Sequence, residues 1–163
     1  MKNKKAFQSV NPEMIPAYQI YQSYSEDEQK VLQVFAVHRR PVIQTKMAGI
    51  LRTLYKEFQI GPLYKIMQKS FRERALNDGV LLNQGSLLYC PDELSLLLVM
   101  ETIKLDQFNA IKKCSLAQIP YAGNQYEYNV TTFEREGDKI RRVQNALFEQ
   151  KDTALLAIIK CDE

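Results

Sequence analysis

The chain has 163 residues, a formal net charge of +3 and an apolar content of 45%, enough to fill the core of one domain or of a small domain with a compact extension. Its longest apolar runs, at 94–100 and 154–159, are much shorter than the roughly 20 residues that cross a bilayer, so the composition excludes a membrane span. We therefore expect a soluble, cytoplasmic protein.

The N-terminal 24 residues begin with several lysines but contain no apolar core of signal-peptide length. We expect this segment to be a flexible leader or a partly helical arm. The chain has three cysteines at wide spacings, Cys90, Cys114 and Cys161, and one histidine, His38. An odd number of cysteines with a single histidine argues against both a disulfide framework and a structural zinc site.

Two helices are predicted between residues 25 and 58. Ser25 and Glu28 have the spacing of a capping box, which predicts a helix from about 26 to 39 that Pro41 stops. Thr45 stands where it could cap a second helix, which would have one apolar stripe and one solvated face. The stripe consists of Met47, Ile50, Leu51, Leu54, Tyr55 and Phe58.

A third helix is predicted over 62–78, with Pro62 in its first turn and Gly79 as its left-handed C-cap. On such a helix Lys65, Lys69 and Arg72 would share one face, with Gln68 beside them. Like charges stacked on one face repel, so an anionic partner is a reasonable explanation, and Gln68 could contact a base edge. The alternative is a solvated basic face.

The basic residues of the chain are concentrated in its middle. Residues 39–74 contain nine basic and two acidic side chains, a local net charge of +7, so the rest of the chain carries −4. Lysine and arginine contacts to phosphates supply most non-specific affinity for nucleic acids, and this segment has the charge that such binding needs. A solvated basic surface is the alternative.

The segment 80–91, VLLNQGSLLYCP, has two short apolar runs around an uncharged Asn83-Gln84-Gly85 tip and predicts a hairpin. Three helices, a short extended segment and a hairpin over about 25–90 resemble a winged helix-turn-helix domain. The resemblance implies that the third helix lies in the major groove of double-stranded DNA and that the hairpin, the wing, lies near the adjacent backbone. The implied DNA-binding residues are Lys65, Gln68, Lys69, Arg72, Arg39, Arg40, Lys46, Arg52, Lys56, Asn83 and Gln84.

The helix predicted at 92–104 is apolar almost all round, so we expect it to be buried against the winged domain, the C-terminal segment or a second copy of the chain. We expect a regulatory DNA-binding protein, in which this helix could form a dimer. The uncharged wing and this apolar helix also fit an alternative function, a winged-helix protein-interaction module that is a subunit or N-terminal domain of a larger assembly.

The last third of the chain, 119–163, is expected to be a small β-α-β subdomain after a boundary near 119–125. A strand is predicted at 125–133, a helix at 137–150 and a buried strand at 153–161. With the preceding helices, 25–118, the chain is therefore expected to be α+β: a mainly helical winged domain followed by a buried helix and a small α/β extension.

Signs of catalysis are weak in this sequence. His38, the single histidine, lies near the apolar side of its helix, where a structural role is favoured over that of a catalytic base. The glycines are scattered singly, so no phosphate-binding loop is predicted. Glu134, Glu136 and Asp138 could bind a cation, but a solvated turn that caps a helix is the better interpretation. We expect no enzyme activity, no cofactor and no metal site.

Overall fold

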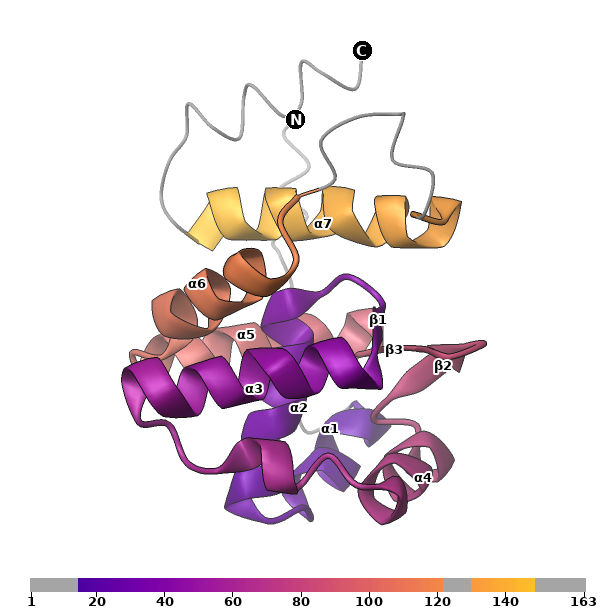
Figure 1. Ribbon diagram of the computed structural model, residues 1–163. Helices are drawn as coiled ribbons and strands as arrows, with labels where there is room; N and C mark the ends of the chain where they lie inside the picture. The colour runs from indigo at the N-terminus through magenta and orange to yellow at the C-terminus, as the bar shows by residue number, and fades with distance from the viewer. Residues whose placement is uncertain (1–14, 122–129, 149–163) are drawn as a thin grey trace, which may run out of the picture.

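The chain forms a mainly helical α+β structure in which one small antiparallel sheet lies at the side of a group of helices (Figure 1). The computed structural model describes residues 15–121 and 130–148. The helices over these residues are α1 (Pro16–Gln22), α2 (Glu26–His38), α3 (Gln44–Phe58), the 3-10 turn η2 (Leu63–Lys65), α4 (Lys69–Asp78), α5 (Asp92–Lys104), α6 (Phe108–Gln118) and α7 (Thr132–Phe148). The strands are β1 (Val42–Ile43), β2 (Leu82–Gln84) and β3 (Leu87–Tyr89).

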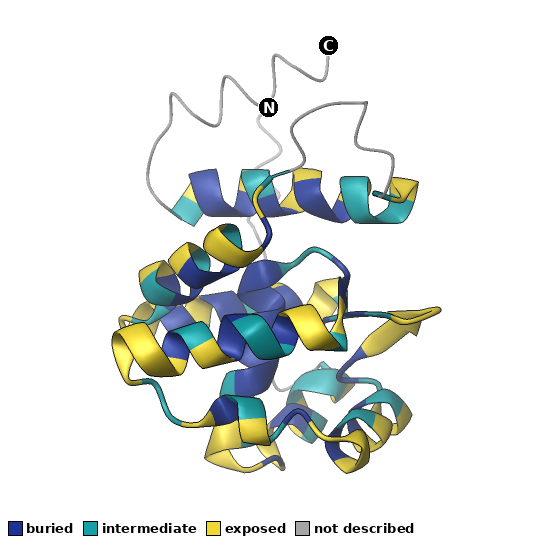
Figure 2. Ribbon diagram, in the orientation of Figure 1, coloured by how far each residue is buried: buried dark blue, intermediate teal, exposed yellow. Residues whose placement is uncertain are grey.

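Helix α2 is the centre of the core, and its start is set by the predicted capping box. The Ser25 hydroxyl accepts a hydrogen bond from the Glu28 amide, and the Glu28 carboxylate accepts one from the Ser25 amide, both at 3.2 Å. Every residue from Val31 to His38 is buried, as the continuous dark ribbon of α2 in Figure 2 shows. Such a helix must be covered on all sides, and α3, α5 and α6 pack around it.

The sheet attaches the hairpin to the helices. Strand β3 pairs with β2 on one side and with β1 on the other, both antiparallel, so the strand order is β1-β3-β2. Val42 lies opposite Leu88, and both side chains are buried. The turn lies one step later than the sequence indicates, because Gln84 pairs with Leu87 and leaves Gly85 and Ser86 as the connection. Asn83 and Gln84 are therefore strand residues.

The prediction of one continuous third helix over 62–78 is wrong. Leu63–Lys65 form a 3-10 turn, Gln68 is extended with φ −107° and ψ 164°, and α4 begins only at Lys69. The break still buries Leu63, Met67 and Phe71, the side chains that a continuous helix would have placed on one face. The carbonyl of Met67, which has no helical partner, accepts a hydrogen bond of 3.2 Å from the Gln44 amide group at the start of α3.

Two helix boundaries also differ from the sequence interpretation. Helix α3 begins at Gln44 and its N-cap is Ile43, so Thr45 lies inside the first turn and is not the cap. Between Phe58 and Lys69 the chain passes through η2, which makes the connection longer than the expected short helix-to-helix turn. The C-cap of α4 agrees with expectation, because Gly79 has a left-handed φ of 74°.

Residues 15–24 are packed against the rest of the structure, whereas a flexible leader would not be. Helix α1 packs on α5, and the Tyr18 and Tyr21 hydroxyls each donate a hydrogen bond of 2.7 Å to the Glu101 carboxylate. Tyr21 is 1% exposed and accepts a further hydrogen bond from the Gln33 amide group at 2.8 Å. The part of the expected arm from Pro16 to Gln22 is therefore helical and packs on the core, and residues 1–14 lie outside the described residues.

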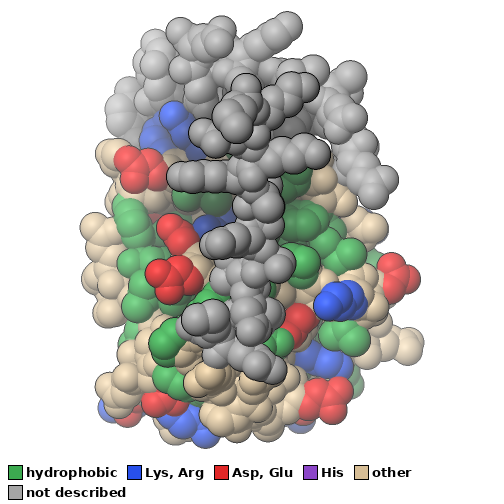
Figure 3. Space-filling view, turned by 180° about the vertical axis from the view of Figure 1, so that it is seen from behind, with side chains coloured by type: hydrophobic (Ala, Val, Ile, Leu, Met, Phe, Trp, Pro, Cys, Tyr) green, Lys and Arg blue, Asp and Glu red, His purple; other side chains and the backbone are tan. Residues whose placement is uncertain are grey.

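Helix α5 is buried on one side only, which corrects the expectation that it is covered all round. Leu94, Leu98 and Val99 are buried, whereas Leu96 and Met100 are exposed. On the face seen from behind, hydrophobic side chains reach the surface of the described part on both sides of the residues drawn in grey (Figure 3). Within the described residues, Leu96 and Met100 of this helix therefore remain exposed.

The C-terminal part of the described chain is one long helix. Helix α7 covers most of the predicted helix at 137–150 but begins five residues earlier, at Thr132. The predicted strand at 125–133 is therefore wrong for residues 130–133: Val130 and Thr131 belong to no strand, and Thr132 and Phe133 lie in the first turn of α7. The rest of that strand up to residue 129, and the strand predicted at 153–161, lie outside the described residues.

Candidate nucleic-acid interface

Three of the predicted recognition residues lie together where η2 leads into α4. The side chains of Lys65, Gln68 and Lys69 are exposed, but the helix break means that they do not form one helical face. Lys65 and Gln68 line a hollow of about 520 Å³ between the start of α2 and α4. The same hollow contains Asp27 and Glu28, so its charge is mixed.

Ion pairs reduce the positive charge of α4. The Lys69 ammonium lies 3.7 Å from the Glu73 carboxylate, and Arg74 pairs with Glu28 of α2. The Arg74 guanidinium also lies 4.6 Å from the ring centre of Tyr24 and makes a cation-π contact with it. Arg74 therefore has its partners within the chain. Arg72 is half-buried, and its Nε is buried without a hydrogen-bond partner among the described residues.

The basic residues of α3 are presented to solvent. Lys46 lies in the first turn, Arg52 in the middle and Lys56 in the last turn, and all three side chains are exposed. The Arg52 guanidinium lies 5.6 Å from the ring centre of Tyr64 on η2. These cations stay available to an anionic partner, because exposed charges held by a cation-π contact keep most of their surface in water.

The structure assigns Arg39 and Arg40 to internal ion pairs. Arg39 donates a hydrogen bond of 2.8 Å to Asp92 at the start of α5, and Arg40 lies 3.9 Å from Glu134 and 3.8 Å from Asp138 of α7. Both arginine side chains are largely buried. They neutralise acids of the chain itself, so they are not placed to contact phosphates.

The wing presents polar groups without charge. All three residues of β2 are exposed, and the Asn83 side-chain amide donates a hydrogen bond of 3.4 Å to the Gly85 carbonyl. Figure 1 shows the β2-β3 hairpin projecting from the body of the molecule. Gln84, at the end of β2, could donate to a phosphate or accept from another protein with equal ease.

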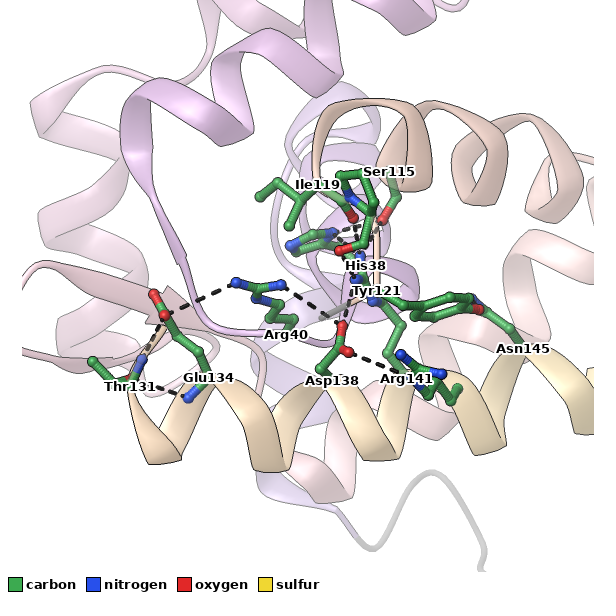
Figure 4. A network of polar contacts seen from close by, with 12 residues as sticks. His38, Arg40, Ser115, Ile119, Tyr121, Thr131, Glu134, Asp138, Arg141 and Asn145 are labelled. Carbon is green, nitrogen blue, oxygen red and sulfur yellow. Dashed lines mark hydrogen bonds and ion pairs between the residues drawn. The ribbon is translucent and has the colours of Figure 1, made fainter. Parts of the chain in front are cut away.

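A buried polar cluster, which the sequence analysis did not predict, fixes α7 to the body (Figure 4). The Arg141 guanidinium is 0% exposed and donates to the Ile119 carbonyl at 2.9 Å, to the Ser115 hydroxyl at 3.4 Å and to the Asp138 carboxylate at 2.5 Å. The Gln144 amide group adds hydrogen bonds to two carbonyls at the end of α2. A buried arginine needs such a set of acceptors, and no local sequence signal reveals them.

His38 belongs to this cluster and has a structural role. Its Nδ1 lies 2.6 Å from the Ser115 hydroxyl and 3.5 Å from Nη1 of Arg141. A guanidinium has only donors, so this geometry requires an unprotonated Nδ1 that accepts. Burial, and then the positive charges of Arg141 and Arg40, lower the pKa of His38 well below its ordinary value. The ring is therefore neutral and fully buried inside the cluster.

Helix α7 has its polar side inward and its apolar side outward. Asp138, Arg141 and Gln144 are buried, whereas Ile140, Val143 and Leu147 are exposed, Leu147 by 54%. The three apolar residues line a hollow of about 500 Å³ together with Leu96 of α5. Amphipathic helices ordinarily bury the apolar side, so this strip of α5 and α7, which we call the α5-α7 strip, lacks its ordinary covering within the described residues.

The acidic residues at the start of α7 cap a helix. The Glu134 carboxylate and the Thr131 hydroxyl form a capping box through hydrogen bonds of 3.0 and 3.1 Å to each other's amides, and Asp138 faces arginines. No group of three or more metal-ligating side chains occurs in the part of the chain that the structure describes. None of the described helices has both the length and the apolar character that a membrane span requires.

Cys90 and Cys114 are buried free thiols. Burial raises the pKa of Cys90 to about 12 and that of Cys114 to about 11, values at which a thiol is a poor nucleophile near neutral pH. Neither thiol belongs to the surface that contains Lys65 and Gln68.

Comparison with known proteins adds no assignment: no family model, no curated protein and no solved structure matches this chain. The interpretation of its surfaces rests on their own geometry and charge.

Proposed function

We propose that this chain binds double-stranded DNA as a winged-helix module, with α4 directed to the major groove and the β2-β3 hairpin beside it. The proposal is supported mainly by the way in which the sheet connects the hairpin to the helices. The strand order β1-β3-β2 ties the hairpin to the segment before α3, while Gly79 joins the hairpin directly to α4. This connection presents a short helix and a projecting hairpin together, the arrangement with which winged helices grip a duplex.

The residues that support the duplex interface are fewer than the sequence indicates. Lys65, Gln68 and Lys69 are exposed at the start of α4, and Lys46 adds an exposed cation at the start of α3. Arg39 and Arg40 are excluded by their ion pairs with acids of α5 and α7. A contact set with these three lysines predicts modest affinity and a shallow dependence on salt, because each phosphate contact contributes about 0.9 to the salt slope.

A salt titration of duplex binding tests the proposal. The wild-type chain is compared with a Lys65→Ala, Lys69→Ala double variant and with a matched Lys104→Ala, Lys139→Ala variant that removes the same charge from α5 and α7. We expect the first variant to lose about 2 from the slope of log affinity against log salt, and the second to lose little. Equal slopes in both variants would exclude the start of α4 as the duplex contact.

The α5-α7 strip supports a second candidate function, binding of another protein or of a second copy of the chain. Its exposed side chains Leu96, Ile140, Val143 and Leu147 line one hollow, which Arg39, Asp92 and Lys139 also border. Val143→Asp should weaken an assembly that uses this strip, because a carboxylate would lose its hydration in the contact. Sedimentation equilibrium over a range of concentrations measures self-association. A concentration-independent monomer mass in the wild-type chain excludes the dimer and leaves a different protein as the partner.

A further inference from the structure

Helix α3 and the turn η2 together carry an exposed group of aromatic and cationic side chains. Arg52 and Lys56 lie on the face of α3 that is opposite to its buried stripe, and Tyr55, three residues after Arg52, lies beside them at the edge of that stripe. Tyr55 is 45% exposed, and its ring meets that of Tyr64 edge-on with centroids 5.9 Å apart. We call Arg52, Tyr55, Lys56 and Tyr64 the α3-η2 platform.

The exposure of the Tyr55 ring needs an explanation, because the chain has an apolar core that could hold it, and the half-buried Tyr64 does pack against that core. Tyr55 is 45% exposed although it follows the fully buried Leu51 by four residues, so it lies at the edge of the buried stripe and not within it. The Arg52 guanidinium lies over the Tyr64 ring at 5.6 Å, which holds a cation beside the open ring of Tyr55. A flat aromatic ring next to a guanidinium and a free ammonium provides both stacking and phosphate contacts.

The charge around the platform is positive. Between residues 52 and 65 the chain has three cations, Arg52, Lys56 and Lys65, against one acid, Glu57. These three cations could bind the phosphates of a duplex or of a single strand equally well. The tyrosines distinguish the two, because bases in a duplex are stacked on each other and hide their flat faces, whereas unpaired bases can stack on a side chain.

We propose that the α3-η2 platform binds single-stranded nucleic acid by stacking an unpaired base on Tyr55, with Arg52 and Lys56 on the adjacent phosphates. The site lies at the end of α3 remote from the wing, because α3 runs away from the sheet (Figure 1). It shares Arg52 and Lys56 with the phosphate contacts predicted from the sequence, but Tyr55 and Tyr64 are new. The inference goes beyond duplex binding at α4 and does not depend on it.

The test uses the full chain and three labelled probes of matched length and charge: a single strand of twenty deoxythymidines, an abasic strand with the same phosphates, and an acidic peptide. Fluorescence anisotropy at one salt concentration gives the three dissociation constants. We expect the thymidine strand to bind about tenfold more tightly than the abasic strand, since one stacked base accounts for roughly that factor. Equal affinity for the two strands, absence of binding to both, or tighter binding of the peptide would overturn the proposal.

Two substitutions at one exposed position separate stacking from folding. Tyr55→Phe keeps the ring and should retain the preference for bases, whereas Tyr55→Leu should abolish it and leave binding to the abasic strand unchanged. Phe133→Leu, which removes a half-buried ring of α7 outside both the platform and the hairpin, is the matched control and should change neither affinity. Circular dichroism and the thermal midpoint establish that each variant is folded. A base preference that persists in folded Tyr55→Leu would overturn the proposal.

The test of the α3-η2 platform can be distinguished from the test of duplex binding at α4. Lys65→Ala with Lys69→Ala should weaken duplex binding and keep the preference for thymidine over the abasic strand, whereas Tyr55→Leu should do the reverse. Failure of duplex binding with an intact base preference would refute only the function proposed for α4. Loss of the base preference with intact duplex binding would refute only the platform.

Discussion

The imidazole of His38 and the hydroxyl of Ser115 lie 2.6 Å apart although they are separated by 77 positions in the sequence. The contact exists because the C-terminal turns of α2 and α6 meet beneath α7. Both groups are fully buried, and the Arg141 guanidinium lies above them. A histidine in this position must stay neutral for α7 to remain in place.

We expect the protein to lose stability as the pH falls below about 6.5. The pKa of His38 in the folded state is lowered, first by burial and then by Arg141 and Arg40, below the 6.5 of the unfolded chain. The unfolded state therefore binds a proton that the folded state does not, so the free energy of unfolding decreases with falling pH. Denaturant titrations between about pH 7.5 and 5.5 measure this slope. His38→Gln should flatten it, and identical slopes in the two proteins would contradict the assignment.

Replacement of Arg141 should be far more costly than replacement of its neighbour. Arg141→Met leaves the buried Asp138 carboxylate and the Ile119 carbonyl without this donor, and we expect a loss of about 3 kcal/mol or more from the free energy of unfolding. Arg142→Met is the matched control, because that side chain is about a third exposed and should cost under about 1 kcal/mol. Chemical denaturation measures both, and equal losses would refute the role of Arg141 as the central donor.

Two glycines inside helices should respond in opposite directions to alanine. A Cβ at Gly137 would lie 2.5 Å from Cδ of Pro41 and 3.2 Å from the Arg40 backbone, so Gly137→Ala should push α7 away and cost about 1–3 kcal/mol. A Cβ at Gly49 would meet only the end of the flexible Gln118 side chain, at 3.1 Å, so Gly49→Ala should be neutral or stabilise by up to about 1 kcal/mol. Thermal midpoints of the two variants give the sign. A stabilising Gly137→Ala would show that α7 does not pack this closely.

Helix α1 should detach when Glu101 loses its charge. Glu101→Gln replaces one acceptor oxygen by a donor, so the Tyr18 and Tyr21 hydroxyls can no longer both donate to it, and we expect a loss of about 1–3 kcal/mol. Hydrogen exchange of the amides at 16–22 should become faster than in the wild type. Glu93→Gln, an exposed carboxylate in the first turn of the same α5, should leave this exchange unchanged. Unaltered protection in Glu101→Gln would mean that other contacts hold α1.

Local signals in the sequence were sufficient where the interaction partners are close in the chain. The Ser25-Glu28 capping box and the left-handed Gly79 depend on neighbours within about four residues, and the structure confirms both. The stripe of α3 is confirmed for Met47, Ile50, Leu51 and Leu54, whereas Tyr55 and Phe58, which the sequence also placed in it, are exposed. The prediction of one continuous third helix was wrong because the break in it depends on a contact between residues that are distant in the chain. The periodicity of this segment is genuine, but the side chain of Gln44 reaches Met67 across 23 positions and stabilises an extended residue that interrupts the helix.

The candidate site could be predicted only in part for a similar reason. Lys65, Gln68 and Lys69 are exposed as the sequence analysis requires, since exposure of a charged side chain follows from its place relative to the apolar stripe. Arg39 and Arg40 were predicted as DNA contacts from the same local excess of basic residues, but in the structure they form ion pairs within the chain. Their partners Asp92 and Glu134 lie 53 and 94 positions away, so the charge count of a segment cannot reveal that these cations are already neutralised.

The sequence by itself determined the α+β class, most of the helices, the hairpin and the basic character of the middle segment, because periodicity, caps and charge are properties of nearby residues. Only the tertiary structure decided which cations are free, that α5 is open on one side, and that α7 turns its polar face inward. Arg141 can be buried only where the ends of α2, α6 and α7 bring its acceptors together. The free energy of such a cluster depends on the simultaneous approach of distant segments, which no local pattern encodes.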